Sequence, residues 1–251
     1  MIGKLKDTFK RRPVLMRKII VSPAIFEKFP DFVCGIIIVK DIQIAQKNKR
    51  IKKPLNKIIE QRKVEGQDLI NHPYIQAWDE AHRRFASDPE HYLPSLKSLL
   101  ARIMVGGGLP FINSVVTLFN YISLKYLIPC GGDDIKKISG NLCLDFATGE
   151  ENFIGLGSKE LEHPYKGEVI YYDDQSKQIM CRRWNWRNAE FSKISDDSKE
   201  IVINVDGIGD IPTSVIIEAR DELADLLQEH CNARLTTDLL TGQNQQIVLP
   251  D

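Results

Sequence analysis

Hydrophobic residues recur along this chain with two different periods, and the period changes about halfway. From Tyr74 to Leu127 apolar residues fall at every third or fourth position, which is the spacing of amphipathic helices. From Asn141 to Asp206 short runs rich in β-branched residues alternate with turn residues, as in strands. Helices gathered before strands predict an α+β fold, with mixed sheets packed against helices, rather than an alternating parallel sheet.

The same patterns give the expected elements and their limits. Helices are predicted at 55–63, 74–86, 95–105, 112–127 and 214–231. Strands are predicted at 17–21, 32–44, 142–146, 152–154, 167–172, 178–182 and 200–205. Residues 47–54 are expected to form a charged loop. We divide the chain into a basic N-terminal segment (1–18), a single domain (19–233) and a polar C-terminal tail (234–251) that is expected to pack weakly.

Composition narrows the class of protein. Hydrophobic residues make up 43% of the 251 and charged residues 27%, which is ordinary for a folded chain. No apolar run approaches the roughly 20 residues that a membrane-spanning helix needs, and the first residues lack a signal-peptide pattern. The five cysteines are widely spaced and form no CxxC motif. Reduced thiols and a cytoplasmic location are therefore expected, with no membrane partner.

Charge is distributed unevenly although the formal net charge is zero. Residues 1–63 contain 17 Lys or Arg and 5 Asp or Glu, a net charge of +12, so the remainder carries −12. The densest basic run, KNKRIKK at 47–53, is a candidate nucleic-acid contact. The alternative is a solvated face that balances the acidic half. The candidate contacts are Lys49, Arg50, Lys52 and Lys53.

Several enzyme classes are excluded because the sequence motifs that they require are absent. The chain has no GxxxxGK[ST], no GxGxxG after a strand, no HExxH and no GxSxG. Its five histidines are scattered, so a metal site is not expected, and neither is a cofactor.

Two segments combine polar and aromatic residues in an unusual way. Asn113 and Asn120 lie seven residues apart, so two helical turns bring both amides to one face of an apolar helix. The alternative is a helix cap at Asn113 and a satisfied core amide at Asn120. In the segment CRRWNWR (181–187), strand alternation would send Trp184 and Trp186 to one face and Arg187 to the other. That segment is a candidate pocket wall, or else a core tryptophan pair with surface arginines.

Four of these segments together resemble a known family. They are LPFINSVVTLFNYISLKYLIPCGGD (109–133), GNLCLDFATGEENF (140–153), GEVIYYD (167–173) and CRRWNWR (181–187). This order is similar to free-standing relatives of the editing module of phenylalanyl-tRNA synthetase, which is the third and fourth domains (B3/B4 type) of its β subunit. The resemblance covers roughly residues 19–226.

The resemblance implies a function. In the synthetase this module hydrolyses the ester of a wrongly charged tRNA, so the family implies a trans-editing deacylase that binds the aminoacylated end of tRNA. One implied substrate is tRNA-Arg carrying canavanine, an arginine analogue. The alternative is a module that binds aminoacyl-tRNA or an amino acid without cleaving it, because the synthetase's pocket histidine is replaced here by Gly131.

The resemblance also suggests site residues. Asn120 corresponds to a pocket asparagine and is expected to orient substrate or water. The backbone N–H groups of Gly131 and Gly132 are candidate oxyanion donors. An acidic pocket residue falls on Asn204 if no gap is assumed or on Asp206 with a two-residue insertion, and we favour Asp206. The candidate substrate-binding residues are Asn113, Asp134, Glu150, Glu168, Trp184, Trp186, Arg187 and Asp206.

Overall fold

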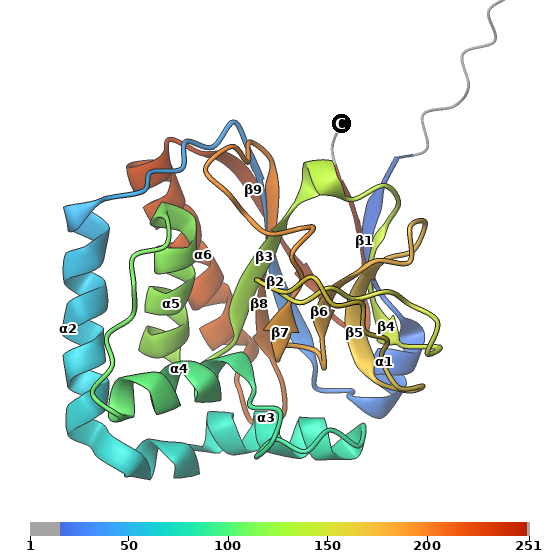
Figure 1. The fold of residues 1–251 in the computed structure, drawn as a ribbon, viewed down its shortest axis with the longest axis horizontal. Helices are drawn as coiled ribbons and strands as arrows, with labels where there is room; N and C mark the ends of the chain where they lie inside the picture. Colours follow the sequence, from blue (N-terminus) through green and yellow to red (C-terminus); the bar gives the residue numbers. More distant parts are fainter. Residues whose placement is uncertain (1–15, 250–251) are drawn as a thin grey trace, which may run out of the picture.

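Two β-sheets and a group of helices make up residues 16–249, the part of the chain that the computed structural model describes (Figure 1). The larger sheet has the strand order β10 (Gln246–Val248), β1 (Lys18–Val21), β4 (Leu142–Phe146), β5 (Val169–Asp173), β6 (Ile179–Arg182), β7 (Arg187–Asn188). The smaller sheet has the order β3 (Cys130–Asp134), β8 (Ile201–Gly207), β2 (Val33–Lys40), β9 (Arg234–Leu240). β1 and β4 pair in parallel and the other neighbours pair antiparallel, so the predicted α+β fold with mixed sheets is confirmed.

Helices cover one face of the smaller sheet. α6 (Thr213–Cys231) packs on β2, β8 and β9, while α5 (Ser114–Tyr126) packs on β3, and α2 (Lys49–Glu65) packs on α5 (Figure 1). Each presents an apolar stripe inward, as an amphipathic helix must. The other face of this sheet meets the larger sheet, and Tyr171 of β5 hydrogen-bonds across to Asp206 of β8. The main core therefore extends through both sheets.

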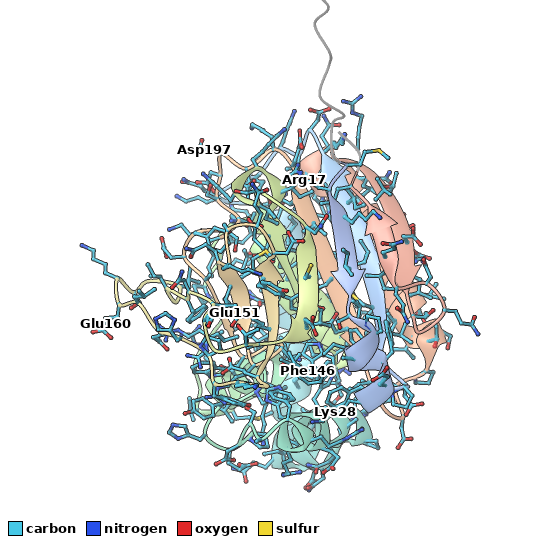
Figure 2. The ribbon with its side chains drawn as sticks, turned by 90° about the vertical axis from the view of Figure 1, so that its right-hand side faces the viewer. Arg17, Lys28, Phe146, Glu151, Glu160 and Asp197 are labelled. Carbon is cyan, nitrogen blue, oxygen red and sulfur yellow. The ribbon has the colours of Figure 1, made fainter. Side chains whose placement is uncertain are left out.

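The remaining helices close the ends of the two sheets. α3 (Pro73–Arg84) and α4 (Ser95–Met104) run along one end, and α1 (Pro23–Lys28) packs against β4 (Figure 1). Two short 3-10 helices, η1 (Gly66–Asn71) and η2 (Ile135–Lys137), follow α2 and β3. At one end of the larger sheet Arg17 donates to the carbonyls of Ile135 and Ile138, and at the other Lys28 lies over the ring of Phe146 (Figure 2).

Most predicted helices and strands are confirmed within a few residues, but three expectations are wrong. Residues 49–54 of the supposed loop are the start of α2, because Asn48 caps the helix through the N–H groups of Arg50 and Ile51. Residues 130–134, where no strand was expected, form strand β3. The supposed strand through the two tryptophans is a tight turn between β6 and β7, since Arg183 and Trp184 have φ angles of 46° and 64°.

The C-terminal segment is part of both sheets. β9 pairs with β2 along seven residues, and β10 pairs with β1. The expectation that residues 234–251 pack weakly is therefore wrong for 234–249. The rest of that tail and residues 1–15 of the predicted basic segment lie outside the described residues.

Candidate functional site

A small cavity lies where the edge strand β3 meets the β6–β7 turn and the start of α4. Its volume is about 50 Å³, room for a few water molecules or a group as small as an ester, since one water needs at least roughly 10–15 Å³. Both sheets contribute to its wall, which is why residues distant in sequence meet there. The lining residues are Ser95, Pro129, Cys130, Gly131, Gly132, Asp133, Tyr171, Cys181, Trp184, Asn185, Asn188 and Asn204.

Strand pairing determines which backbone N–H groups of β3 face the cavity. The N–H of Asp206 donates to the carbonyl of Pro129 (3.1 Å), and the N–H of Ile135 donates to the carbonyl of Glu200 (3.0 Å). Because hydrogen-bonded pairs alternate along an antiparallel ladder, Gly131 uses its N–H within the sheet. The N–H of Gly132 points outward from the edge of the sheet. Of the two predicted oxyanion donors, only Gly132 is thus available, and the expectation for Gly131 is wrong.

Close packing explains the glycine at position 132, whereas position 131 has room for a side chain. A Cβ atom on Gly132 would lie 2.4 Å from the carbonyl oxygen of Val202 and 3.2 Å from the ring of Phe119, which packs from the helical side. A Cβ on Gly131 would lie 3.8 Å from Oδ1 of Asn204, on the cavity side. Here a side chain, including the histidine of the synthetase pattern, would fill the space beside Asn204.

Asn204, and not Asp206, is the β8 residue that lines the cavity. Its Nδ2 donates to Oδ2 of Asp206 (3.0 Å), so its Oδ1 is left toward Gly131. Asp206 is fully buried behind it and accepts from the hydroxyl of Tyr171 at 3.1 and 3.2 Å. Burial raises the pKa of Asp206 to about 6. The preference for Asp206 over Asn204 as the cavity residue was wrong, because the ungapped alignment gives the residue that faces the cavity.

Asp133 is an acidic cavity residue that the sequence did not indicate. It lies on the same face of β3 as Gly131, whereas the predicted Asp134 points to the opposite face because side chains alternate along a strand. Asp133 accepts from the hydroxyl of Ser192 at 2.6 Å, and burial raises its pKa to about 6. Asp134 instead caps η2 through the N–H of Lys136 and accepts from a serine hydroxyl.

The two predicted tryptophans have different environments. Trp184 is fully buried, with edge-on contacts to the rings of Phe29 (4.9 Å) and Trp78 (5.2 Å), and lines the cavity. Trp186 is half-buried outside the cavity, against Tyr92 (4.9 Å between ring centroids). The predicted two-tryptophan wall therefore has one member.

Glu168 and Arg182 form a buried ion pair rather than a substrate contact. Two bonds of 2.8 Å join the Arg182 guanidinium to the Glu168 carboxylate, which also accepts from the N–H of Arg183 at 3.1 Å. These bonds occupy the Glu168 carboxylate, and Glu168 is not among the residues that line the cavity, so the structure does not support it as a substrate-binding residue. Arg187 pairs with Glu162 (3.2 Å), outside the cavity lining.

The two predicted asparagines do not line the cavity. Asn113 is the N-cap of α5 and accepts from the N–H of Val116 at 2.9 Å, so the structural alternative holds for it. Asn120 is half-buried on α5, the helix that packs against the opposite face of β3. Glu150 is exposed in the loop after β4. The furthest part of that loop carries Glu160 away from the body of the protein (Figure 2).

The predicted nucleic-acid contacts lie together on one helix. All four are exposed, in the first turns of α2, which have no acidic residue. Positive charge at a helix N-terminus opposes the helix dipole, so this surface favours an anionic partner. The four residues are Lys49, Arg50, Lys52 and Lys53.

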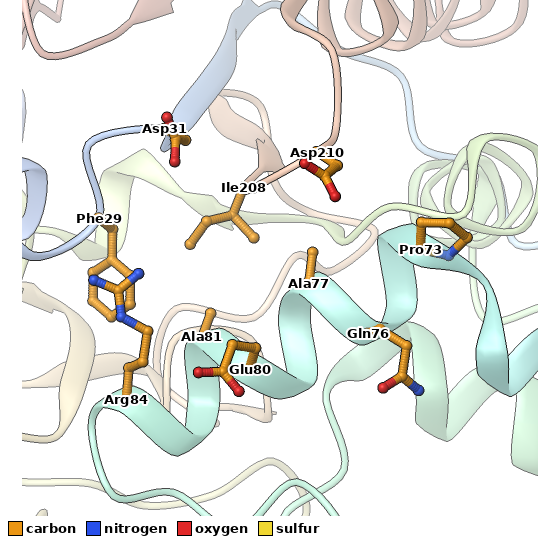
Figure 3. A pocket seen from close by; sticks show the side chains of 11 residues that line it. Phe29, Asp31, Pro73, Gln76, Ala77, Glu80, Ala81, Arg84, Ile208 and Asp210 are labelled. Atoms are coloured by element: carbon orange, nitrogen blue, oxygen red, sulfur yellow. The ribbon is translucent and has the colours of Figure 1, made fainter.

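Two larger hollows lie apart from all predicted site residues. One, of about 340 Å³, follows α3 and has the carboxylates of Asp31, Glu80 and Asp210 around an apolar floor (Figure 3). The other, of about 360 Å³, is a mainly apolar groove between η1 and α4. Within residues 16–249 no cluster of His, Cys, Asp and Glu is arranged to hold a metal ion. The helices of this part of the chain are all too short or too polar to cross a membrane.

These features define an α+β protein with a polar cavity at the junction of two sheets. A model of the B3/4 domain family matches residues 77–232, which is more than half of the chain. The chain therefore belongs to the B3/4 domain family, and the resemblance seen in the sequence is confirmed at that level.

Comparison with solved structures finds similarity to an N-terminal fragment of the phenylalanyl-tRNA synthetase β-subunit from Pyrococcus horikoshii. The TM-score is 0.47 and the sequence identity 14%, over 86% of this chain and 49% of that one. This chain thus spans about half the length of that fragment. Comparison with curated proteins gives no match.

Proposed function

We propose that this protein is a trans-editing aminoacyl-tRNA deacylase, which hydrolyses the ester between a wrong amino acid and the end of its tRNA. The observation that carries the proposal is the cavity in which the outward N–H of Gly132 and Oδ1 of Asn204 face the same space. An N–H donor suits the carbonyl oxygen of an ester, and an amide oxygen suits an attacking water, and both residues line this cavity. The shared B3/B4-type motifs support tRNA as the partner and the cytoplasm as the location.

The chemistry needs no cofactor. The oxygen of a water molecule bonds to the ester carbonyl carbon, and the carbonyl oxygen becomes an oxyanion that accepts from the N–H of Gly132. The carbon–oxygen bond to the ribose then breaks, and the ribose oxygen takes the proton that the water gives up. The products are a free amino acid and an uncharged tRNA. Oδ1 of Asn204 accepts a hydrogen bond from the water and so orients it.

Asp133 supports a cationic substrate side chain. With a pKa of about 6 its carboxylate is mostly ionised at neutral pH. It lines the cavity beside Gly132 and keeps one oxygen free of the Ser192 hydroxyl bond. An arginine-like amino acid such as canavanine on tRNA-Arg is therefore the first substrate to test, and the cavity of about 50 Å³ must widen to admit its side chain.

A deacylation screen across mischarged tRNAs tests the proposal. We expect turnover by the wild type and a loss of about 10²-fold in kcat for Asn204→Ala, the size found when one positioned polar group is removed. Gln228→Ala, which removes an exposed carboxamide from α6, is the matched control. Asn120→Ala tests the family-implied role of Asn120: a loss equal to that of Asn204→Ala would include it in the mechanism.

The alternative function is a module that binds aminoacyl-tRNA or an amino acid without cleaving it. One observation favours it: no histidine of residues 16–249 lines this cavity. Tight binding of a mischarged tRNA with no release of amino acid from any charged tRNA would reject the deacylase and support this alternative.

A further inference from the structure

Six buried side-chain atoms, all at one contact, have no hydrogen-bond partner within residues 16–249. Three belong to α3 and three to the β6–β7 turn that packs against it. Buried polar groups are almost always paired, so such a cluster requires an explanation. The atoms are Trp78 Nε1, Asp79 Oδ1, His82 Nδ1, Arg183 Nε, Trp184 Nε1 and Asn185 Nδ2.

Asn185 and Trp184 are the two members of this group that line the cavity, and Asn185 carries a buried amide donor, Nδ2, without a partner. It is 7% exposed and lines the cavity described above. Its Oδ1 lies 3.2 Å from Nε2 of His82, so its Nδ2 points away from that ring. The main chain is held as well, because the carbonyl of Asn185 accepts from the N–H of Ser95 at 2.9 Å.

His82 is suited to fix this amide. It is fully buried, and burial lowers its pKa to about 4, with the positive charges of Arg183 and Lys97 acting in the same direction. The ring is therefore neutral at pH 7 and carries one proton. Oδ1 of Asn185 can only accept a hydrogen bond, so the ring proton of His82 is on Nε2. Nδ1 of His82 then carries no proton.

The turn that carries Asn185 is strained. Arg183 and Trp184 both have left-handed φ angles, of 46° and 64°, although neither is glycine. Two such residues in succession persist only where the surroundings enforce them, and they concentrate at functional sites. Here the edge-on contact of Trp184 with Trp78 of α3, 5.2 Å between centroids, holds the turn in place.

We propose that Nδ2 of Asn185 donates a hydrogen bond to the carbonyl oxygen of the bound aminoacyl group, beside Gly132, and that His82 is the positioning residue that orients it. This inference rests on the proposed function. The second donor stabilises the oxygen as it gains negative charge, while the proton from water still leaves with the ribose oxygen. Removal of such a donor lowers kcat much more than it changes KM.

Two variants at Asn185 and two at His82 test the proposal. We expect Asn185→Ala and the isosteric Asn185→Asp to lower kcat by about 10²-fold with KM within about threefold. His82→Phe removes the ring proton and is expected to cost about 10-fold or more through misplacement. His82→Gln keeps a donor and should restore most of the activity. Glu80→Gln, an exposed change on the same helix, is the control.

A measurement without turnover separates this inference from the proposed function. The side-chain amide signals of Asn185 in the wild type are followed by NMR during titration with adenosine that carries an amide-linked arginine at its 3′ position. We expect them to shift on saturation, even if no ester is hydrolysed. Unmoved signals at saturation would overturn the inference, because ordered water alone would then fill the cavity. Wild-type kcat in Asn185→Ala would overturn it as well and would leave the deacylase proposal standing.

Discussion

Replacement of Asp206 by Asn should change how the stability of this protein depends on pH. The carboxyl group is fully buried between the sheets, where it accepts from the Tyr171 hydroxyl and the Asn204 amide. Burial raises its pKa from the ordinary 3.8 to about 6. The folded protein therefore binds this proton more tightly than the unfolded chain does.

The size of the effect follows from that shift. About two pKa units at roughly 1.4 kcal/mol each correspond to about 3 kcal/mol. Because the folded pKa is the higher one, this contribution is fully present below about pH 4 and is lost as the pH rises through about 6. Asn cannot titrate, so the variant lacks this pH dependence. The hydrogen bonds that the substitution alters shift its stability by an amount that is the same at every pH.

Urea unfolding of both proteins from pH 4 to pH 8 measures the difference. The buried Trp78 and Trp184 provide the fluorescence signal. We expect the free energy of unfolding of Asp206→Asn, relative to the wild type, to rise by about 3 kcal/mol across this range. Asp133 is present in both proteins, so its contribution cancels in the difference between variant and wild type. Asp225→Asn, on the exposed face of α6, is the control. A difference between variant and wild type that does not change from pH 4 to pH 8 would refute the reasoning.

Three further predictions concern other parts of the protein. Glu168→Gln leaves the buried Arg182 charge poorly compensated and should lower the free energy of unfolding by about 3–5 kcal/mol; an unchanged urea midpoint would contradict the description of this pair. Gly132→Ala places a Cβ 2.4 Å from a backbone oxygen; it should cost about 1–3 kcal/mol in thermal unfolding, and an unchanged unfolding temperature would contradict the close packing at this position. A variant with Gln at all four basic positions of α2 should reduce the slope of log K against log salt for tRNA binding by up to about 3, at roughly 0.7–0.9 per phosphate contact; an unchanged slope would locate the nucleic-acid surface elsewhere. Those positions are Lys49, Arg50, Lys52 and Lys53.

Periodicity was sufficient for most of the fold because apolar spacing is a local property. The helix predicted at 95–105 is α4, and the strand predicted at 142–146 is β4. Local signals failed at β3, where two adjacent glycines usually mark a helix end. In this fold Gly132 allows close approach to Val202 and Phe119, a tertiary requirement that the sequence does not display.

The candidate site was harder to predict because it depends on register and on backbone conformation. Asp133 and Asp134 are neighbours in the sequence, and Asn204 lies only two residues before Asp206. Which residue of each pair lines the cavity depends on how β3 and β8 pair, and the sequence alone does not give that pairing. The turn at Arg183 and Trp184 was missed because bulky residues rarely adopt positive φ. Asn185 lies in the same turn, and its contact with His82, 103 positions away in sequence, has no local signal.

The pairing of β1 with β10 and of β2 with β9 has a consequence for biosynthesis. Each of these two early strands needs a partner that is translated about 200 residues later, as in the pairs Lys18–Val248 and Ile36–Asp238. A nascent polypeptide on the ribosome therefore carries β1 and β2 with unpaired edges until the strands after α6 emerge. Such edges recruit other chains. Slow translation or a premature stop after α6 should consequently increase aggregation and the demand for chaperones.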